Sequence, residues 1–141
     1  MNNELKNTPR GLRNNNPLNI RRSADLWQGL RKEQSDPEFF QFESIAWGYR
    51  AAFVVLRTYR HRYGANTIES IVKRWAPDAD GNDTEYYIRK VAVLTGLARN
   101  EPVDDRNPKM MMELVAAMSR VENGVPAVMR EVMAGWNLYL G

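Results

Sequence analysis

The sequence predicts an all-α protein, or an α-helical protein with a minimal hairpin, folded as a single domain. Apolar residues recur every three or four positions over several long segments, which is the spacing of one face of an α-helix. Gly, Asn or Pro follow most of these segments and mark their ends. The chain has 141 residues and no internal repeat, which fits one domain. We therefore expect about five helices around one core.

The amino-terminal part of the chain shows the least periodicity. We expect residues 1–10 to form a flexible lead-in and residues 11–141 to form the domain. The segment from Gly11 to Gly29 is rich in Asn and Arg, and is predicted to be an ordered loop with a short helix or hairpin. Phe40 and Phe42 then share one side of an extended piece.

The helices are predicted to follow this extended piece. Ser44 is a suitable N-cap for the first of them. Asn82 and Glu85 have the spacing of a capping box for the third, and Pro126 suits the first turn of the last. The predicted ranges are 45–63, 67–75, about 82–95, 107–121 and 126–139.

The composition excludes several kinds of site. The chain has no cysteine, which rules out disulfides, thiolate nucleophiles and cysteine-based metal sites. Its one histidine, His61, stands between two arginines, which indicates a solvated helix face rather than a metal ligand. The acidic turn at 78–85 lacks the later glutamate that a calcium loop needs. We therefore expect no metal and no cofactor.

The ends and the charge of the chain bear on its location and partners. The amino terminus has no apolar core of a secretory signal, and no apolar run approaches the length of a membrane helix. We expect a protein that is made in a cytoplasm without a signal peptide and has no membrane span. Residues 1–62 carry more basic than acidic side chains, which would attract any polyanion. A nucleic-acid-binding helical module is therefore one interpretation, but no helix carries a basic stripe with interleaved aromatics, so no nucleic acid is expected.

One carboxylate continues an apolar stripe. With about 100° per residue, Met111, Val115, Met118 and Glu122 fall on the same side of the helix that starts near Asn107. Asn-Gly follows Glu122 and ends the helix, so this side chain should face inward near a surface cleft. A partly apolar setting at the negative end of a helix disfavours a second negative charge, which suits a carboxyl that must donate a proton.

A plainer interpretation of Glu122 stays open. A glutamate that borders the core can extend to water or pair with an arginine such as Arg50 or Arg89. Glu113 points to the opposite face of its helix, and Glu69 lies off the apolar face of its own, so neither is placed for desolvation.

A series of short motifs covers nearly the whole chain. They are GLRNNNPLNIR at 11–21, WQG at 27–29, FFQF at 39–42, GYRA at 48–51, TI at 67–68, WAP at 75–77, NDT at 82–84 with Tyr87, and ENG at 122–124. In this order they resemble a family of small phage and prophage proteins, the virion-associated, lysozyme-like peptidoglycan hydrolases that are similar to lytic transglycosylases.

The resemblance implies a single lysozyme-like helical domain whose partner is bacterial peptidoglycan. It implies cleavage of the MurNAc-GlcNAc glycan strand by a lytic transglycosylase or a muramidase, with Glu122 as the single general acid and base. It also implies a protein made in the bacterial cytoplasm that reaches the periplasm and cell wall in a virion, with other virion proteins as partners, or through a holin. Two alternatives stay open: a non-catalytic phage structural or wall-binding protein of the same fold, and a peptidoglycan endopeptidase.

The order of the motifs departs from that of the soluble lytic transglycosylases. There, a helix ending in Glu-Ser-Gly precedes the segments that line the cleft, whereas here the similar Glu-Asn-Gly stands near the carboxyl terminus. Either the domain is circularly permuted with Glu122 catalytic, or an earlier carboxylate such as Glu43 takes the role. We favour Glu122. Hydrolysis would need a second carboxylate, for which Asp36, Glu43 and Asp83 are the candidates.

Several side chains are predicted to bind the substrate. Amides carry donors and acceptors that suit a sugar polymer, although clustered Asn residues equally favour turns. The resemblance places a tyrosine near the acid, and tryptophans stack on sugar rings or pack in a core; packing is favoured for Trp75. The predicted substrate-binding residues are Asn14, Asn15, Asn16, Asn19, Trp27 and Tyr87. We expect the Asn-rich loop and the end of the Glu122 helix to meet across one cleft.

Overall fold

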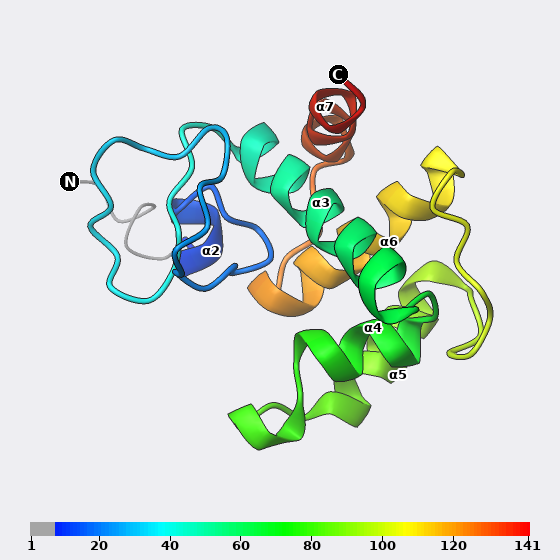
Figure 1. Ribbon diagram of the computed structural model, residues 1–141. Helices are drawn as coiled ribbons and strands as arrows, with labels where there is room; N and C mark the ends of the chain where they lie inside the picture. Colours follow the sequence, from blue (N-terminus) through cyan, green and yellow to red (C-terminus); the bar gives the residue numbers. More distant parts are fainter. Residues whose placement is uncertain (1–7) are drawn as a thin grey trace.

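The computed structural model describes residues 8–141, and Figure 1 shows how their helices are arranged. The prediction of an all-α fold is confirmed, because this part of the chain holds helices and two isolated β-bridges, Arg21–Phe39 and Leu30–Phe42, but no strand. The elements are α2 (Arg10–Arg13), α3 (Ile45–Tyr63), α4 (Ile68–Trp75), the 3₁₀ helix η1 (Asp78–Asp80), α5 (Thr84–Thr95), α6 (Pro108–Asn123) and α7 (Met129–Leu140). The predicted lead-in lies outside the described residues up to residue 7, and Arg10 opens α2. None of the described helices is long and apolar enough to span a bilayer.

Local sequence signals place most of the helix ends. Helix α3 has the predicted bounds and ends at Gly64, which adopts the left-handed conformation that glycine tolerates best. Ser44 holds the N-cap position of α3 but makes no side-chain capping bond. Thr67 caps α4 in a reciprocal pair with Ser70.

Two helix starts differ from the prediction. The cap of α5 is Asp83, whose carboxylate accepts from the Tyr86 amide, whereas the Asn82 amide donates to the Pro77 carbonyl and closes the preceding turn. Helix α7 begins at Met129 rather than Pro126, because residues 125–128 carry the chain from the end of α6 to the start of α7.

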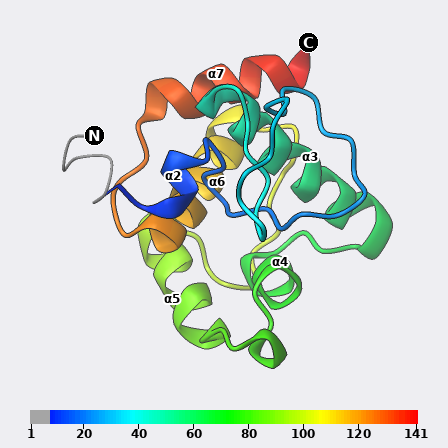
Figure 2. The ribbon, with the colours of Figure 1, turned by 90° about the vertical axis from the view of Figure 1, so that its left-hand side faces the viewer.

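Most of the helices share one hydrophobic core. Phe53 of α3, Val72 of α4, Ile88 of α5, Leu114 of α6 and Val132 of α7 are all completely buried in it. Figures 1 and 2 show α7 lying along α3, on the side of the molecule away from α4 and α5. The irregular segment that follows α2 rests on a second, smaller cluster.

Gly135 lets α7 lie directly on α3. A Cβ at this position would stand 3.0 Å from the Ala46 carbonyl oxygen and 3.0 Å from the Arg50 nitrogen, and closer still to the Tyr49 side chain. Backbone atoms cannot move aside as a flexible side chain can. The contact between the two helices therefore depends on the missing side chain.

We expect Gly135→Ala to destabilise the protein by about 1–3 kcal/mol, because overpacking forces the helices apart. This is opposite in sign to the usual effect of replacing a helical glycine by alanine. Thermal unfolding followed by circular dichroism measures it. Asn137→Ala, an exposed substitution on the same helix, is the matched control and should change little; a Gly135→Ala variant as stable as the parent would contradict the packing argument.

The segment between α2 and α3 has little regular structure but is well packed. Phe40 and Phe42 are buried with Ile20 and Ala51, as the sequence predicts for the first two. Backbone bonds such as Phe40 N–H to the Ile20 carbonyl, at 3.1 Å, pair its two arms. This segment forms one side of the site described below.

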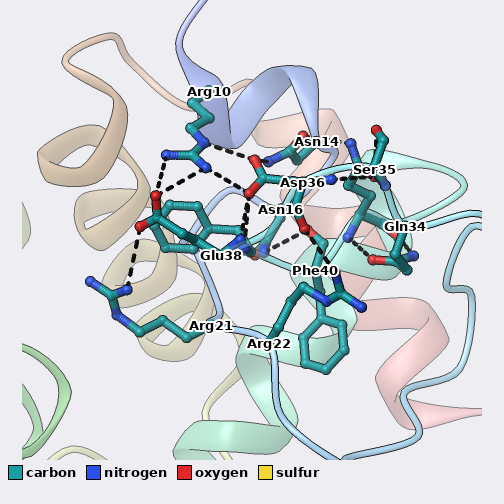
Figure 3. A network of polar contacts seen from close by, with 12 residues as sticks. Arg10, Asn14, Asn16, Arg21, Arg22, Gln34, Ser35, Asp36, Glu38 and Phe40 are labelled. Carbon is teal, nitrogen blue, oxygen red and sulfur yellow. Dashed lines mark hydrogen bonds and ion pairs between the residues drawn. The ribbon is translucent and has the colours of Figure 1, made fainter.

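A buried carboxylate, Asp36, ties this segment to α2 (Figure 3). The Arg10 guanidinium donates to its two oxygens at 2.6 and 2.7 Å, and the Asn14 amide donates at 2.9 Å. The amides of Glu38 and Phe39 donate to Oδ1 of Asp36. The hydrogen bonds from Arg10, with those from Asn14 and the two amides, hold the pKa of Asp36 well below its usual range.

Candidate active site

Glu122 lies in the last turn of α6, with its side chain half-buried. Its Oε1 accepts a hydrogen bond from the Asn19 amide at 3.1 Å. Its Oε2 accepts two, from the Tyr87 hydroxyl at 2.9 Å and from the Trp75 indole N–H at 3.1 Å. These donors come from the Asn-rich loop, from α5 and from the end of α4, so three distant segments converge on one carboxyl group.

All three donors are neutral. Within residues 8–141, no Lys, Arg or His nitrogen forms an ion pair with Glu122. The interpretation that Glu122 pairs with Arg50 or Arg89 is therefore wrong. Among the described residues, the contacts of the Glu122 carboxyl group are thus hydrogen bonds from neutral donors.

Glu122 lines a cavity of about 280 Å³. Asn19, Arg21 and Phe39 of the loop border this cavity on one side, and Trp75, Asp80 and Asn82 border it from the end of α4 and the turn after it. Figure 2 shows α2 and its loop beside α6, with α4 and α5 beneath them. The prediction that the Asn-rich loop and the Glu122 helix end meet at one cleft is confirmed.

Tyr87 is buried on the inner face of α5. Burial, and after it the nearby charge of Glu122 and the hydrogen bond to it, raises the pKa of the Tyr87 phenol well above its usual value. The phenol therefore keeps its proton and stays a donor to Glu122. The structure places Tyr87 beside the predicted acid, where the resemblance expects a tyrosine.

Two features bring the Asn19 side chain to Glu122: the left-handed backbone of Asn19 and the absence of a side chain at Gly11. Its φ of 54° lies in the left-handed region, which Asn tolerates better than most residues. A Cβ on Gly11 would lie 2.8 Å from the Asn19 Oδ1, so only glycine leaves room for the amide in this position. Gly11 thus acts on the site through Asn19.

The three consecutive asparagines build the loop instead of facing the cavity. Asn16 is fully buried, and its amide donates to the Ile20 and Phe40 carbonyls. Asn14 is buried between Asp36 and Gln41 and bonds both. The expectation that Asn14 and Asn16 bind substrate is corrected, because their polar groups are used inside the protein.

Of Asn15, Trp27 and Trp75, only Trp75 is hydrogen-bonded to Glu122. Asn15 has a φ of 52° and its amide donates to the Phe42 carbonyl, so it too serves the turn. Trp27 is half-buried and lines a second cavity rather than that of Glu122. Trp75, for which packing was favoured, packs in the core and also donates to Glu122.

None of the three predicted second carboxylates lines the Glu122 cavity. Asp36 is held by Arg10, Asp83 caps α5, and Glu43 is exposed just before α3. Asp80, in η1, does line it. Sequence reasoning missed Asp80 because the acidic turn around it contains several carboxylates, and only the folded chain shows which one reaches the cavity.

The described residues also limit what kind of site this is. From residue 8 to residue 141, the His, Asp and Glu side chains form no cluster of three that could hold a metal ion. His61 is largely exposed on α3 and lies 3.5 Å from Asp105. The polar groups at the cavity are the carboxyl groups of Glu122 and Asp80, the guanidinium of Arg21, the amides of Asn19 and Asn82, and the Tyr87 phenol and Trp75 indole that donate to Glu122.

No known family model matches this chain. The chain is 40% identical to Protein P5 of Pseudoalteromonas phage PM2 over 142 residues, an alignment that covers 96% of this chain and 86% of that protein. Such identity over most of the length of both chains means that the two proteins share a common ancestor and a fold. This chain belongs to the family of Protein P5 of the Pseudoalteromonas phage PM2.

Proposed function

We propose that this protein is a phage or prophage enzyme that cleaves the MurNAc-GlcNAc glycan strand of peptidoglycan, with Glu122 as its general acid and base. One observation carries the proposal: a carboxyl group lines an open cavity, is held by three neutral donors and has no cationic partner in the described chain. The relationship to a phage protein agrees with the phage part of the proposal. A lysozyme-like fold, permuted so that the acid comes late in the chain, is part of the same proposal.

The hydrogen bonds indicate which oxygen transfers the proton. A carboxylate oxygen has two lone pairs, and Oε2 uses both, for Tyr87 and Trp75. Oε1 uses one, for Asn19. The remaining lone pair of Oε1 is thus the position from which Glu122 would donate its proton and to which it would later accept one.

The reaction needs only this one carboxyl group. Glu122 donates its proton to the glycosidic oxygen as the bond from that oxygen to the anomeric carbon breaks. The C6 hydroxyl of the same sugar then attacks the anomeric carbon, and its proton returns to Glu122. The products are a free hydroxyl on one fragment and a 1,6-anhydro ring on the other, with no water consumed.

A muramidase reaction would use water in place of the C6 hydroxyl. Asp80 is the carboxylate that lines the cavity and could orient such a water. The choice between transglycosylase and hydrolase therefore depends on whether Asp80 takes part. We favour the transglycosylase, because Asp80 is exposed and, among residues 8–141, no hydrogen bond or ion pair holds its carboxylate in a fixed orientation toward a water.

Digestion of purified peptidoglycan sacculi tests the proposal. We expect mass spectrometry to find soluble muropeptides with 1,6-anhydro ends, and Asp80→Asn to keep the rate within a few-fold of the parent. Hydrated reducing ends, lost on Asp80→Asn, would make the protein a muramidase. Released peptides without cut glycan would indicate an endopeptidase, and binding without any release would indicate a structural or wall-binding protein.

The proposed route to the wall follows from the substrate. Peptidoglycan lies outside the cytoplasmic membrane, and the described helices include none that could span one. We propose that a virion, with its other proteins as partners, or a holin pore brings the protein to the periplasm. Virion fractions probed with an antibody against this protein would distinguish the two.

A further inference from the structure

A second cavity, of about 890 Å³, lies between the same loop and the same end of α4. Its walls include Trp27 from the loop, Tyr59, Arg62 and Tyr63 from α3, and Arg74 from α4. We call it the basic groove. Trp75 and Ala76 line the Glu122 cavity, whereas Arg74 and Pro77, on either side of them in the chain, line the basic groove.

The loop also contributes neighbouring residues to both cavities. Arg21 borders the Glu122 cavity and Asp25 borders the basic groove, four residues further along. An extended chain advances up to about 3.6 Å per residue, so four residues span roughly 14 Å at most. The two cavities therefore lie close to each other, and each is bordered by the loop and by the end of α4.

The basic groove carries positive charge that no ion pair within residues 8–141 fully neutralises. Of its cations, Lys73 is bonded to Glu69 at 2.7 Å. Arg62 and Arg74 have no carboxylate within ion-pair distance in the described part of the chain. Guanidinium groups without a carboxylate partner are suited to bidentate binding of carboxylates.

The groove is also built to hold one of these cations in place. The Arg74 guanidinium lies 3.2 Å from the centre of the Tyr63 ring and 5.7 Å from that of Tyr59, so aromatic faces fix it without cancelling its charge. Trp27 also lines the groove, which therefore has three aromatic side chains in its walls.

We propose that the basic groove binds the peptide stem of the same peptidoglycan strand through the stem carboxylates. The inference rests on the proposed function, since the stem hangs from the sugar whose glycosidic bond would lie at Glu122. A stem of five residues extends up to about 18 Å, which is enough to pass from one cavity into the other. Its carboxylates can accept hydrogen bonds from the guanidinium groups of Arg62 and Arg74, and its amides can lie against the aromatic rings of the groove.

A peptide fits the basic groove better than a nucleic acid does. Asp25 lines the same groove. A phosphodiester chain carries one negative charge at every residue and no positive group, so Asp25 would repel it. A peptide stem carries the amino group of its diamino acid as well as carboxylates, and can therefore satisfy both Asp25 and the arginines.

The test measures binding without catalysis, on the full chain carrying Glu122→Gln. The probes are a free tetrapeptide stem with its carboxylates and the same stem fully amidated, titrated by isothermal calorimetry. We expect the carboxylate stem to bind, and Arg62→Gln with Arg74→Gln to weaken it by ten-fold or more. We expect the amidated stem to bind the Glu122→Gln chain, with both arginines present, at least ten-fold more weakly than the carboxylate stem does. Arg130→Gln, an exposed arginine on α7, is the matched charge control and should leave the affinity unchanged.

Equal affinity for both stems, or no effect of the double variant, would overturn the inference. Tighter binding of a single-stranded oligonucleotide, lost in the double variant, would make the groove a polyanion site and also overturn it. Should the double variant fail to fold by circular dichroism, Arg62→Gln alone carries the same expectation. If the unsubstituted protein cuts no glycan but its Glu122→Gln form binds the stem, the proposed function is refuted and this inference stands. If the protein cuts glycan but does not bind the stem, this inference is refuted and the proposed function stands.

Discussion

Replacing Glu122 by glutamine is expected to abolish cleavage of peptidoglycan while leaving the fold intact. Glutamine keeps the shape of the side chain but cannot transfer a proton, and general acid catalysis contributes about 10²–10⁴-fold to a rate. Clearance of a sacculus suspension should therefore slow by at least two orders of magnitude. This is the largest effect on activity that the structure predicts for a single substitution.

The surroundings of Glu122 explain why the variant should stay folded. The amide oxygen of a glutamine can take the place of Oε2 and accept from Tyr87 and Trp75. Its NH₂ group would then face the donating NH₂ of Asn19. The Asn19 Oδ1 is buried and has no partner among residues 8–141, so rotating the Asn19 amide by half a turn presents an acceptor and removes the conflict.

Two measurements on one preparation check this prediction. The circular dichroism spectrum and melting temperature of Glu122→Gln should match those of the parent, while turbidity clearance is lost. Glu113→Gln, on the exposed face of the same helix, should clear at the parental rate. If Glu122→Gln clears sacculi within a few-fold of the parent, Glu122 is structural and the proposed mechanism fails.

Asp36→Ala is expected to cause the largest loss of stability, about 2–4 kcal/mol, since it leaves several buried donors without an acceptor. Asn14 and the amides of Glu38 and Phe39 would lose their common partner, and Arg10 would keep only Glu38. For a protein of this size the loss corresponds to roughly 6–15 °C in melting temperature. Glu38→Ala removes the exposed carboxylate beside the same arginine and should cost much less.

The pH dependence of stability supplies a second measurement on Asp36. Because the pKa of Asp36 is lowered in the folded state, its ionised form contributes stability above the unfolded value of 3.8. This contribution is lost as the pH falls below that value toward the folded pKa. The gap in melting temperature between the parent and Asp36→Asn should therefore be constant near neutral pH and shrink below about pH 4. A gap that does not change between pH 7 and pH 3 would show that ionised Asp36 is not what the network needs.

The sequence by itself determined the parts of this protein that depend on neighbours along the chain. The spacing of apolar residues and the glycine after Tyr63 were enough to predict the bounds of α3 correctly. The phase of α6 was enough to single out Glu122, since residues four apart on a helix share a face whatever packs against it. Phe40 and Phe42 were predicted to share one side of an extended segment, and both are buried.

Only the tertiary structure decided what surrounds that carboxylate and which other carboxylate lines its cavity. The partners of Glu122 are 35, 47 and 103 residues away, and no local pattern encodes a distance of that kind. The same holds for Asn14 and Asn16, whose amides are used by residues across the loop, and for Asp80, one of several similar acids in its turn. Helix phase and capping arise from interactions a few residues apart, which a single sequence displays. The contents of a site arise from long-range packing, which brings the side chains together only when the chain has folded.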